Sequence, residues 1–315
     1  MRIIRQHEGL EAELRGAAAA IGNFDGVHRG HMHVIEQARA VARGLGAPLG
    51  VVTFEPHPRR FFNPDAPPFR LMNAAARAHR LERLGVEILF ELPFDARMAG
   101  RSAEDFARGV LAGGLGLRHV VIGADFRFGK GRAGDAALMT DLGRRLGFGV
   151  TVVPLLSIDG LEISSTAIRR ALSEGRPEDA ARMLGHRHRI EGRVMRGDRR
   201  GRELGFPTAN ISLDDLHLPR FGVYAVEVEI LDGPHRGRHG GAASIGTRPT
   251  FGENRPNLEV HIFDFAGDLY GAEISVALVA FLRPELAFPD AESLVRQMHE
   301  DCARARALLA AHAGA

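Results

Sequence analysis

The sequence predicts an α/β chain in two parts, an N-terminal parallel sheet flanked by helices and a C-terminal antiparallel β-barrel that ends in a helix. Over residues 1–186, short apolar runs alternate with segments of helical spacing, which is typical of parallel strands covered on both faces. From residue 187 onward, short alternating runs separated by Gly, Pro and Asn replace this pattern. We therefore expect one domain over 1–186 and a second over 187–315.

The composition is that of an ordinary globular protein with room for two domains. Of the 315 residues, 45% are hydrophobic and 25% are charged. Lys and Arg number 41 against 39 for Asp and Glu, which gives no electrostatic reason to expect nucleic-acid binding. No apolar run approaches the roughly 18 residues of a membrane-spanning helix, and the N-terminus lacks a signal-peptide pattern. We expect a cytoplasmic protein without a membrane partner, and self-association is left open.

The number of cysteines excludes a disulfide bond within the chain and a cysteine-rich zinc site. Cys302 is the only cysteine of the chain. An intrachain disulfide is therefore impossible, and so is a zinc site built on several cysteines.

The first apolar run leads into a glycine-rich string, IGNFDGVHRGH, over residues 21–31. The run over residues 17–24 and the helical spacing over 31–43 predict a strand, a tight loop and a helix. In such a unit the N–H groups of the loop and of the first helical turn converge on one point that favours an anion. His28 and His31 are three residues apart, so both could donate hydrogen bonds to a phosphate there.

Two alternatives to phosphate binding exist for this loop. His28, His31 and His33 could bind a metal ion, but no Cys or nearby acidic residue completes a recognisable ligand set. The string could also be an ordinary glycine turn. It is not a Walker A loop or a dinucleotide fingerprint, because neither Gly-Lys-Ser/Thr nor GxGxxG is present.

The alternation of strands and helices continues after this unit. We expect strands over residues 49–54, 86–92, 119–123 and 150–155, and helices over residues 74–84, 103–111 and 135–146. Ligands of open parallel sheets bind beyond the carboxyl ends of the strands, so the strings that follow the strands are candidate binding loops.

Three such strings have unusual compositions. FEPHP over 54–58 is stiffened by two prolines, and a rigid turn is the alternative to a binding loop. GADFRFGKGR over 123–132 combines aromatic, basic and glycine residues, which suits a ring system beside a phosphate. ISSTAIRR over 163–170 offers hydroxyl groups for a helix N-cap. Capping explains Ser165, but arginine in a first helical turn is disfavoured unless an anion is present.

Together, the strings IGNFDGVHRGH, TFEPHP, IGADFRFGKGRAGD and ISSTAIRRAL resemble the adenylyltransferase module of bacterial FAD synthetases, which has the Rossmann-like HxGH nucleotidyltransferase fold. The resemblance implies transfer of AMP from ATP to FMN with release of pyrophosphate. The residues that it implies are catalytic His28, His31 and Arg169; ATP-binding Gly22, Phe24, Asp25, Gly26, Gly30, Ser164 and Thr166; and flavin-binding Pro56, His57, Pro58, Asp125 and Phe126.

One segment departs from the pattern of that family. The family usually has a hydroxyl-rich stretch and a lysine where this chain reads RLMN over 70–73 and Arg77. Arg77 keeps the positive charge, so only the detail of the helix over 74–84 is affected.

The second half of the chain has strand patterns followed by one helix. We expect strands over residues 190–195, 224–231, 240–245, 258–265 and 273–281. The final helix has Asp290 as a plausible cap and an apolar stripe of Leu294, Met298, Cys302, Ala305 and Leu309. We expect this stripe to pack on the barrel, and a helix that binds another protein is the alternative.

The string GRELGFPTAN over 201–210 supplies glycines for close approach to a phosphate and two neutral oxygen ligands, from Thr208 and Asn210, which suit Mg²⁺. A structural turn is the alternative. This string, with GVYAV, SIGTRPTFG, LEVHIFDF, DLYG and RPE downstream, resembles riboflavin kinase. The resemblance implies ATP binding by Gly201, Gly205 and Pro207, Mg²⁺ binding by Thr208 and Asn210, and flavin binding by Arg283.

The riboflavin kinase resemblance also implies a general base, Glu259. Period-two alternation places Glu259 on the strand face opposite Leu258 and Val260. A carboxylate there could accept the proton of a hydroxyl that attacks the γ-phosphate of ATP. Without the resemblance, a solvated strand residue would be the preferred interpretation.

The two resemblances together imply a bifunctional riboflavin kinase and FAD synthetase, with riboflavin, FMN and ATP as partners, Mg²⁺ as cofactor, and FMN and FAD as products. One alternative is an HxGH nucleotidyltransferase for another phosphate substrate, which the kinase string argues against. The other is a flavin- or nucleotide-binding regulator with degenerate sites, which the presence of His28, His31, Thr208, Asn210 and Glu259 argues against.

Overall fold

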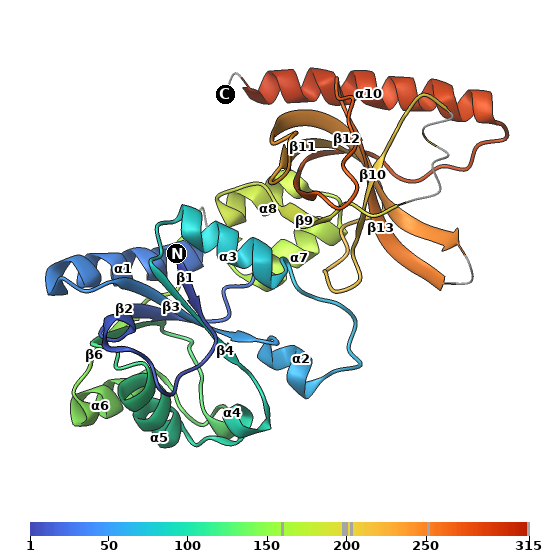
Figure 1. Cartoon of the computed structure of the whole chain (residues 1–315). Helices are drawn as coiled ribbons and strands as arrows, with labels where there is room; N and C mark the ends of the chain where they lie inside the picture. Colours follow the sequence, from blue (N-terminus) through green and yellow to red (C-terminus); the bar gives the residue numbers. More distant parts are fainter. Residues whose placement is uncertain (159–160, 197–200, 202–203, 251–252, 314–315) are drawn as a thin grey trace. The chain divides into compact units, whose positions relative to one another are not determined.

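The computed structural model describes residues 1–158, 161–196, 201, 204–250 and 253–313. The chain forms two compact units (Figure 1). The first unit comprises Met1–Pro67 and Arg77–Ile163, and the second comprises Pro68–Ala76 and Ser164–Ala315. Each unit is built around a six-stranded sheet.

The sheet of the first unit is parallel, in the order β1-β4-β3-β2-β5-β6. Its strands are β1 (Arg2–Ile4), β2 (Ala18–Ile21), β3 (Leu49–Glu55), β4 (Ile88–Pro93), β5 (His119–Gly123) and β6 (Gly149–Val153). A short hairpin of β7 (Ser157–Ile158) and β8 (Leu161–Glu162) follows. The predicted parallel α/β sheet is therefore confirmed, and the sequence did not predict β1.

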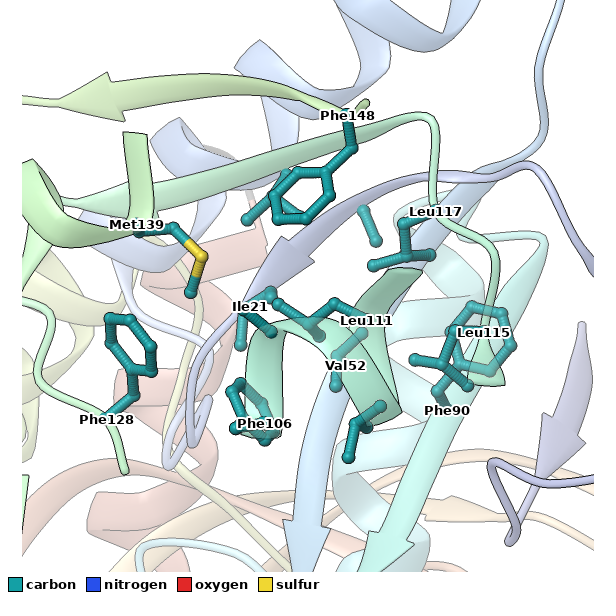
Figure 2. Packing of buried hydrophobic residues seen from close by; sticks show 14 of the residues in the cluster. Ile21, Val52, Phe90, Phe106, Leu111, Leu115, Leu117, Phe128, Met139 and Phe148 are labelled. Atoms are coloured by element: carbon teal, nitrogen blue, oxygen red, sulfur yellow. The ribbon is translucent and has the colours of Figure 1, made fainter. Parts of the chain in front are cut away.

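Helices connect these strands. They are η1 (Ala12–Leu14), α1 (Arg29–Leu45), α2 (Pro58–Phe62), α3 (Ala74–Arg83), α4 (Ala96–Gly100), α5 (Ala103–Asp105), η2 (Phe106–Gly114), η3 (Lys130–Arg132) and α6 (Ala136–Leu146). Figure 2 shows strand residues such as Ile21, Val52 and Phe90 packing with Leu111 of η2 and Met139 of α6 in the core of this unit. In sheets of this kind, ligands usually bind beyond the carboxyl ends of the strands.

The helix predicted over residues 103–111 takes an unexpected form. A single α-helical turn, α5, continues as the π-helix η2. Buried residues recur there in pairs every four positions: Phe106 and Ala107, Val110 and Leu111, Gly114 and Leu115. These pairs form the face of the segment that packs in the core of the first unit.

The sheet of the second unit is antiparallel, in the order β10-β13-β12-β11-β14-β9. Its strands are β9 (Arg189–Arg193), β10 (Ala209–Ser212), β11 (Gly222–Ile230), β12 (Gly237–Thr250), β13 (Glu253–Ile262) and β14 (Glu273–Arg283). A bridge between Met195 and Asn210 joins the two ends of the sheet, so the barrel is nearly closed. The predicted β-barrel is confirmed, and the sequence did not predict β10.

The helices of this unit are α7 (Ser165–Ser173), α8 (Pro177–Leu184) and α10 (Ala291–Ala313). Asp290 caps α10 as expected, because its Oδ1 accepts a hydrogen bond of 2.7 Å from the Ser293 N–H. Ala305 is fully buried, and Cys302 and Leu309 pack on the same apolar cluster, to which Phe263 belongs. The predicted packing of α10 on the barrel is therefore confirmed. Among the described residues, no helix has the length and hydropathy needed to cross a membrane.

Candidate active sites

The loop between β2 and α1 has an unusual backbone. Phe24, Gly26 and Val27 have positive φ angles of 51°, 88° and 42°. A positive φ is readily adopted by glycine, but it is strained for a phenylalanine and especially for a β-branched valine. Phe24 and Val27 are nevertheless fully buried. The fold therefore holds this loop in a conformation that it would not adopt alone.

His28 is the N-cap of α1. Its Nδ1 accepts a hydrogen bond of 3.3 Å from the His31 N–H, so Nδ1 carries no proton and the neutral ring must carry its proton on Nε2. Nε2 is therefore a hydrogen-bond donor. A Cβ on Gly30 would lie only 3.2 Å from the His28 ring, which explains the glycine of the HRGH string.

His31 stacks on His28, with ring centroids 3.6 Å apart and an interplanar angle of 16°. Burial, and secondarily the neighbouring His28, lower the pKa of His31 well below its usual value. His31 is therefore neutral in the free protein. Its Nδ1 is buried and has no hydrogen-bond partner within the part of the chain that the structure describes. The structure thus brings the two predicted histidines together at the start of α1.

Glycines and Asp25 complete the predicted ATP-binding loop. A Cβ on Gly22 would lie 3.4 Å from the ring of Phe24, so the two residues are in close contact. Asp25 is 5% exposed, although aspartate usually lies at the surface. All five predicted ATP-binding residues of this loop, Gly22, Phe24, Asp25, Gly26 and Gly30, lie between the end of β2 and the first turn of α1.

The predicted flavin loop follows β3. Pro56 is joined to Glu55 by a cis peptide bond, and Pro58 is the first residue of α2. His57 caps this helix, because its Nδ1 accepts a hydrogen bond of 3.0 Å from the Arg59 N–H. After β5, Asp125 is exposed, and Phe126 is stacked on Phe128 with ring centroids 5.7 Å apart.

Sequence reasoning missed a set of aromatic rings around these loops. The ring centroids of Phe54 and Phe94 lie 5.7 Å apart, and Phe94 also contacts Phe61 and Phe62 of α2. Phe62 is 62% exposed, which is unusual for a phenylalanine. The signal was present in the sequence, since Phe54 and Phe94 stand at the carboxyl ends of two strands.

The predicted residues of the ISSTAIRR string lie at the start of α7, in the second unit. Ser164, and not Ser165, is the N-cap, because its Oγ accepts a hydrogen bond of 3.2 Å from the Ala167 N–H. The capping interpretation was therefore wrong by one residue. The Nε of Arg169 donates a hydrogen bond of 2.6 Å to the Phe69 carbonyl, and its guanidinium lies 5.5 Å from the Phe69 ring centroid. Thr166 is in the first turn of the helix.

The candidate kinase site lies on the barrel. Glu259 of β13 stands directly opposite Asn210 of β10 on one side and Ser244 of β12 on the other. Leu258 and Val260 are fully buried on the opposite face, which confirms the predicted alternation. Directly paired residues of neighbouring strands project their side chains to the same face. The sheet therefore places the carboxylate of Glu259 beside the amide of Asn210.

Amide groups orient the side chains of this site. Asn257 Nδ2 lies 3.4 Å from Asn210 Oδ1 and 3.5 Å from Glu259 Oε1, and it donates to both. Asn210 Nδ2 donates in turn to the Thr208 carbonyl, at 3.4 Å. The amide oxygen of Asn210 therefore points to the same side as Glu259.

The turn before β10 explains the glycines of the GRELGFPTAN string. The Phe206 N–H donates a hydrogen bond of 2.7 Å to the Gly201 carbonyl, and a Cβ on Gly201 would lie 2.3 Å from the Phe206 carbonyl oxygen. Gly205 has a φ of 84°. The Pro207 carbonyl is hydrogen-bonded to His261, at 3.0 Å. Positions 202–203 of the string, like positions 251–252 of SIGTRPTFG, are outside the described residues.

Arg283, predicted to bind flavin, has a structural partner. Its guanidinium makes hydrogen bonds of 2.7–3.0 Å to both carboxylate oxygens of Asp301, and a further one of 3.0 Å to the Pro284 carbonyl. Asp301 belongs to α10 and is 5% exposed. Arg283 therefore ties β14 to the terminal helix, and flavin contact by Arg283 stays a prediction.

Within the described ranges, no three His, Cys, Asp or Glu side chains are grouped so that they could hold a metal ion. The predicted Mg²⁺ ligands are of another kind, a hydroxyl and an amide oxygen.

Comparisons with known proteins place the chain in a family. The FAD synthetase family model matches residues 10–167, and the riboflavin kinase family model matches residues 184–309. The bifunctional riboflavin kinase/FMN adenylyltransferase of Pseudomonas fluorescens is 42% identical over 98% of both chains, and that of Escherichia coli K12 is 40% identical over 97% of both. The chain belongs to this family.

The chain also resembles a solved structure over nearly its whole length. A crystal structure from Streptococcus pneumoniae, described as a macrolide-efflux protein, matches with a TM-score of 0.81 and 31% identity, covering 95% of this chain and 96% of its own. The chain is thus a transferase with two activities, a kinase that forms FMN from riboflavin and an adenylyltransferase that forms FAD from FMN, both at the expense of ATP.

Proposed function

We propose that residues 1–186 carry out adenylyl transfer and residues 187–315 carry out riboflavin phosphorylation, each with the site residues that the sequence predicts. For adenylyl transfer the supporting observation is the stacked pair of His28 and His31 at the start of α1. For phosphorylation it is the row of Asn210, Glu259 and Ser244 across three strands.

In the first reaction, an oxygen of the FMN phosphate attacks the α-phosphorus of ATP, and the bond from that phosphorus to the bridging oxygen breaks to release pyrophosphate. The FMN phosphate is already ionised at neutral pH, so no general base is required. The reaction needs alignment and neutralisation of charge. His28 supplies an Nε2–H donor at the start of α1, where the helix dipole favours an anion. Ser164, Thr166 and Arg169 are proposed to support the phosphates as well.

His31 has a second role in this proposal. Its ring is neutral in the free protein because burial lowers its pKa. An adjacent polyphosphate has the opposite effect, because a nearby negative charge favours the protonated ring. Binding of ATP would therefore favour the protonated form of His31, whose Nδ1 has no hydrogen-bond partner among the described residues and could then donate to a phosphate oxygen.

Flavin binding uses the loops after β3 and β5. Pro56, His57, Pro58, Asp125 and Phe126 are the predicted contacts. The exposed ring of Phe62 and the neighbouring Phe61 and Phe94 extend them with an aromatic surface that suits an isoalloxazine ring.

In the second reaction, the carboxylate of Glu259 accepts the proton of the primary hydroxyl of riboflavin as its oxygen attacks the γ-phosphorus of ATP. ADP leaves as the bond from the γ-phosphorus to the bridging oxygen breaks. The glycine turn of Gly201, Gly205 and Pro207 lets the backbone approach the phosphates, and Arg283 is proposed to contact the flavin from the end of β14.

The residues present also fit Mg²⁺. Asn210 Nδ2 donates to the Thr208 carbonyl, and Asn210 Oδ1 accepts one hydrogen bond, from Asn257, so a second lone pair of this oxygen is left for a metal ion. The Thr208 hydroxyl is two residues away in the sequence. Neutral oxygens combined with substrate phosphates and water are typical of Mg²⁺ sites. Bound Mg²⁺ would neutralise the charge of the ATP phosphates. We further propose that the enzyme is cytoplasmic and acts on riboflavin, FMN and ATP without a nucleic-acid partner.

One incubation tests this proposal. The full chain is mixed with ATP and either riboflavin or FMN, with Mg²⁺ or with a chelator, and the flavins are separated by chromatography. We expect riboflavin to give FMN and then FAD, FMN to give FAD, and the chelator to stop phosphorylation. Riboflavin that is not phosphorylated in the presence of Mg²⁺ would refute the kinase assignment, and FMN that yields no FAD would refute the other.

A further inference from the structure

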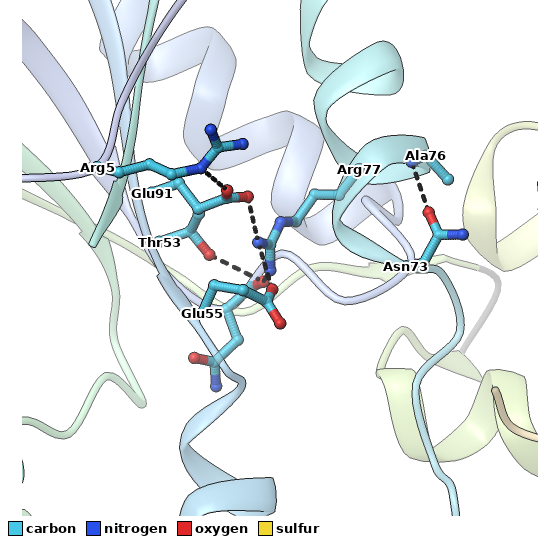
Figure 3. Close-up of polar contacts among 8 residues, drawn as sticks. Arg5, Thr53, Glu55, Asn73, Ala76, Arg77 and Glu91 are labelled. Carbon is cyan, nitrogen blue, oxygen red and sulfur yellow. Dashed lines mark hydrogen bonds and ion pairs between the residues drawn. The ribbon is translucent and has the colours of Figure 1, made fainter. Parts of the chain in front are cut away.

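Arg77 is a fully buried arginine of α3, with 1% of its surface exposed. Its Nη2 donates hydrogen bonds of 2.9 Å to Glu55 and 3.0 Å to Glu91, as Figure 3 shows. Glu91, which is 4% exposed, also accepts a hydrogen bond of 3.0 Å from Arg5 Nε. Arg77 thus joins Glu55, the last residue of β3, to Glu91 of β4, and Arg5 is paired with Glu91 as well.

The same guanidinium reaches the phosphate loop, which is the segment over residues 22–28 between β2 and α1. Arg77 Nη1 donates to the carbonyl of Asn23 at 3.4 Å, and the hydroxyl of Thr53 donates to the same oxygen at 3.2 Å. Asn23 immediately precedes Phe24, the first of the strained residues in the loop that leads to His28. The Asn23 carbonyl is therefore held from two sides at the point where the unusual backbone begins.

The buried pair of this network, Arg77 with Glu91, is not an arrangement that stability alone favours. Well-packed apolar residues of similar volume usually stabilise a fold as well as, or better than, a buried ion pair. A strained backbone likewise persists only where its surroundings fix it. Arg77 links both features, because it pairs with the buried Glu91 and the partly exposed Glu55 and also binds the Asn23 carbonyl at the start of the strained loop.

We propose that Arg77 is a positioning residue for adenylyl transfer. One planar guanidinium fixes the Asn23 carbonyl, and with it the loop that presents His28, and also holds Glu55, the residue before the Pro56–Pro58 turn. The phosphate loop and the flavin loop are thereby kept in one fixed geometry. This inference rests on the proposed role of the His28 loop in binding ATP phosphates.

The shape of the side chain matters in this proposal. Arginine offers five donors in a rigid plane, so it can serve two carboxylates and a carbonyl at once. A lysine would place one nitrogen among the same three acceptors. It keeps the charge, but it cannot reproduce all three contacts with the same geometry.

The experiment compares three variants of the full chain. Arg77→Met/Glu91→Met removes the buried arginine together with its most buried partner, so that Glu91 is not left as an uncompensated charge. Arg77→Lys keeps the charge. Arg15→Met is the matched control, because Arg15 also donates to backbone carbonyls, those of Gly113 and Gly114, but at the amino-terminal edge of the same sheet. Each protein is assayed for FMN adenylylation, riboflavin phosphorylation and thermal unfolding.

We expect the double variant to lower kcat for FMN adenylylation by about 100-fold, because a shift of the reacting groups by about 1 Å can reduce a rate by that factor. KM for ATP should change less than kcat, and riboflavin phosphorylation should be retained. Arg77→Lys should recover most of the loss but remain a few-fold below the unmodified enzyme. The control should keep its kcat.

A folded double variant with unchanged kcat for adenylylation overturns the inference. If that variant does not fold, Arg77→Lys decides, and an unchanged kcat in it has the same meaning. His28→Ala, assayed in parallel, distinguishes failure of the inference about Arg77 from failure of the proposed role of the His28 loop in ATP binding. Full adenylylation in His28→Ala refutes the phosphate loop itself, whereas activity lost in His28→Ala but retained in the Arg77 variants refutes only the positioning role.

Discussion

The N-cap bond of His28 allows its structural and chemical roles to be separated by substitution. His28→Ala removes both the acceptor for the His31 N–H and the Nε2–H donor. Loss of an N-cap costs about 1 kcal/mol of stability. Loss of one preorganised donor in the transition state costs a factor of roughly 10²–10³ in turnover, or about 2.7–4 kcal/mol. We expect both losses in His28→Ala.

Two further substitutions keep the cap. His28→Asn offers a side-chain oxygen to the His31 N–H, so its stability should match that of the unmodified protein, but its shorter amide cannot place a donor where Nε2 was. We expect its turnover of FMN to FAD to fall by roughly 10². His28→Asp should also cap the helix, and its negative charge suits the helix dipole, but it repels phosphate. Its turnover should be the lowest of the series.

The assay measures FAD formation from FMN and ATP at saturating substrate, with thermal unfolding of the same samples and riboflavin phosphorylation as an internal reference. His33→Ala is the control, and it should keep full activity. The reasoning is refuted if turnover follows stability across the series, that is, if His28→Asn and His28→Asp are both active and only His28→Ala is impaired. Loss of activity in His33→Ala would favour a metal site instead.

Three further predictions concern the second unit. Glu259→Gln keeps the shape but removes the proton acceptor, so riboflavin phosphorylation should fall by on the order of 10²–10⁴ while added FMN is still adenylylated; equal loss of both activities contradicts the assignment. Thr208→Ala and Asn210→Ala each remove a proposed oxygen ligand, so phosphorylation should require more Mg²⁺ in a titration, and an unchanged titration would mean that they only shape the turn. Burial lowers the pKa of His188 in the folded protein to about 3. Between pH 3 and about pH 6.5 the unfolded chain therefore binds more protons than the folded protein does. The free energy of unfolding should then fall as the pH falls, by up to about 1.4 kcal/mol per pH unit. His188→Gln should reduce this slope in urea unfolding at pH 7 and pH 5, and equal slopes would contradict the burial argument.

Much of the fold could be predicted because hydrophobic periodicity reports burial directly. The strand predicted over 119–123 has the same bounds as β5, and the helix predicted over 31–43 is the interior of α1. Periodicity is a weaker guide for short edge elements. β1 and β10 have three and four residues, too few to show a period. The π-helical form of η2 was also missed, because the expectation over 103–111 was of a helix without a choice between helix types.

The residues of the candidate sites could be predicted from sequence motifs, but their hydrogen bonds and strand pairing could not. That His28 and His31 lie together followed from their spacing, whereas the capping bond that fixes the tautomer of His28 required the backbone of the loop. The pairing of Glu259 with Asn210 could not be anticipated, because it depends on the register of two strands 49 positions apart in the chain. Arg77 gave no signal as a buried residue, because arginine is usually exposed.

The second unit contains nine residues that are synthesised long before the rest of it. Residues 68–76 belong to this unit together with residues 164–315. The His217 N–H donates to the Arg70 carbonyl at 2.8 Å, and Asn73 Nδ2 donates to the Glu191 carbonyl at 2.9 Å. During translation Arg70 and Asn73 are synthesised more than a hundred residues before their hydrogen-bond partners, His217 and Glu191. A gene fragment that begins near residue 164 or 187 would encode a barrel without this segment, and its backbone partners would then face solvent. The boundary between the two sequence families is therefore not a place where the polypeptide can be cut without loss.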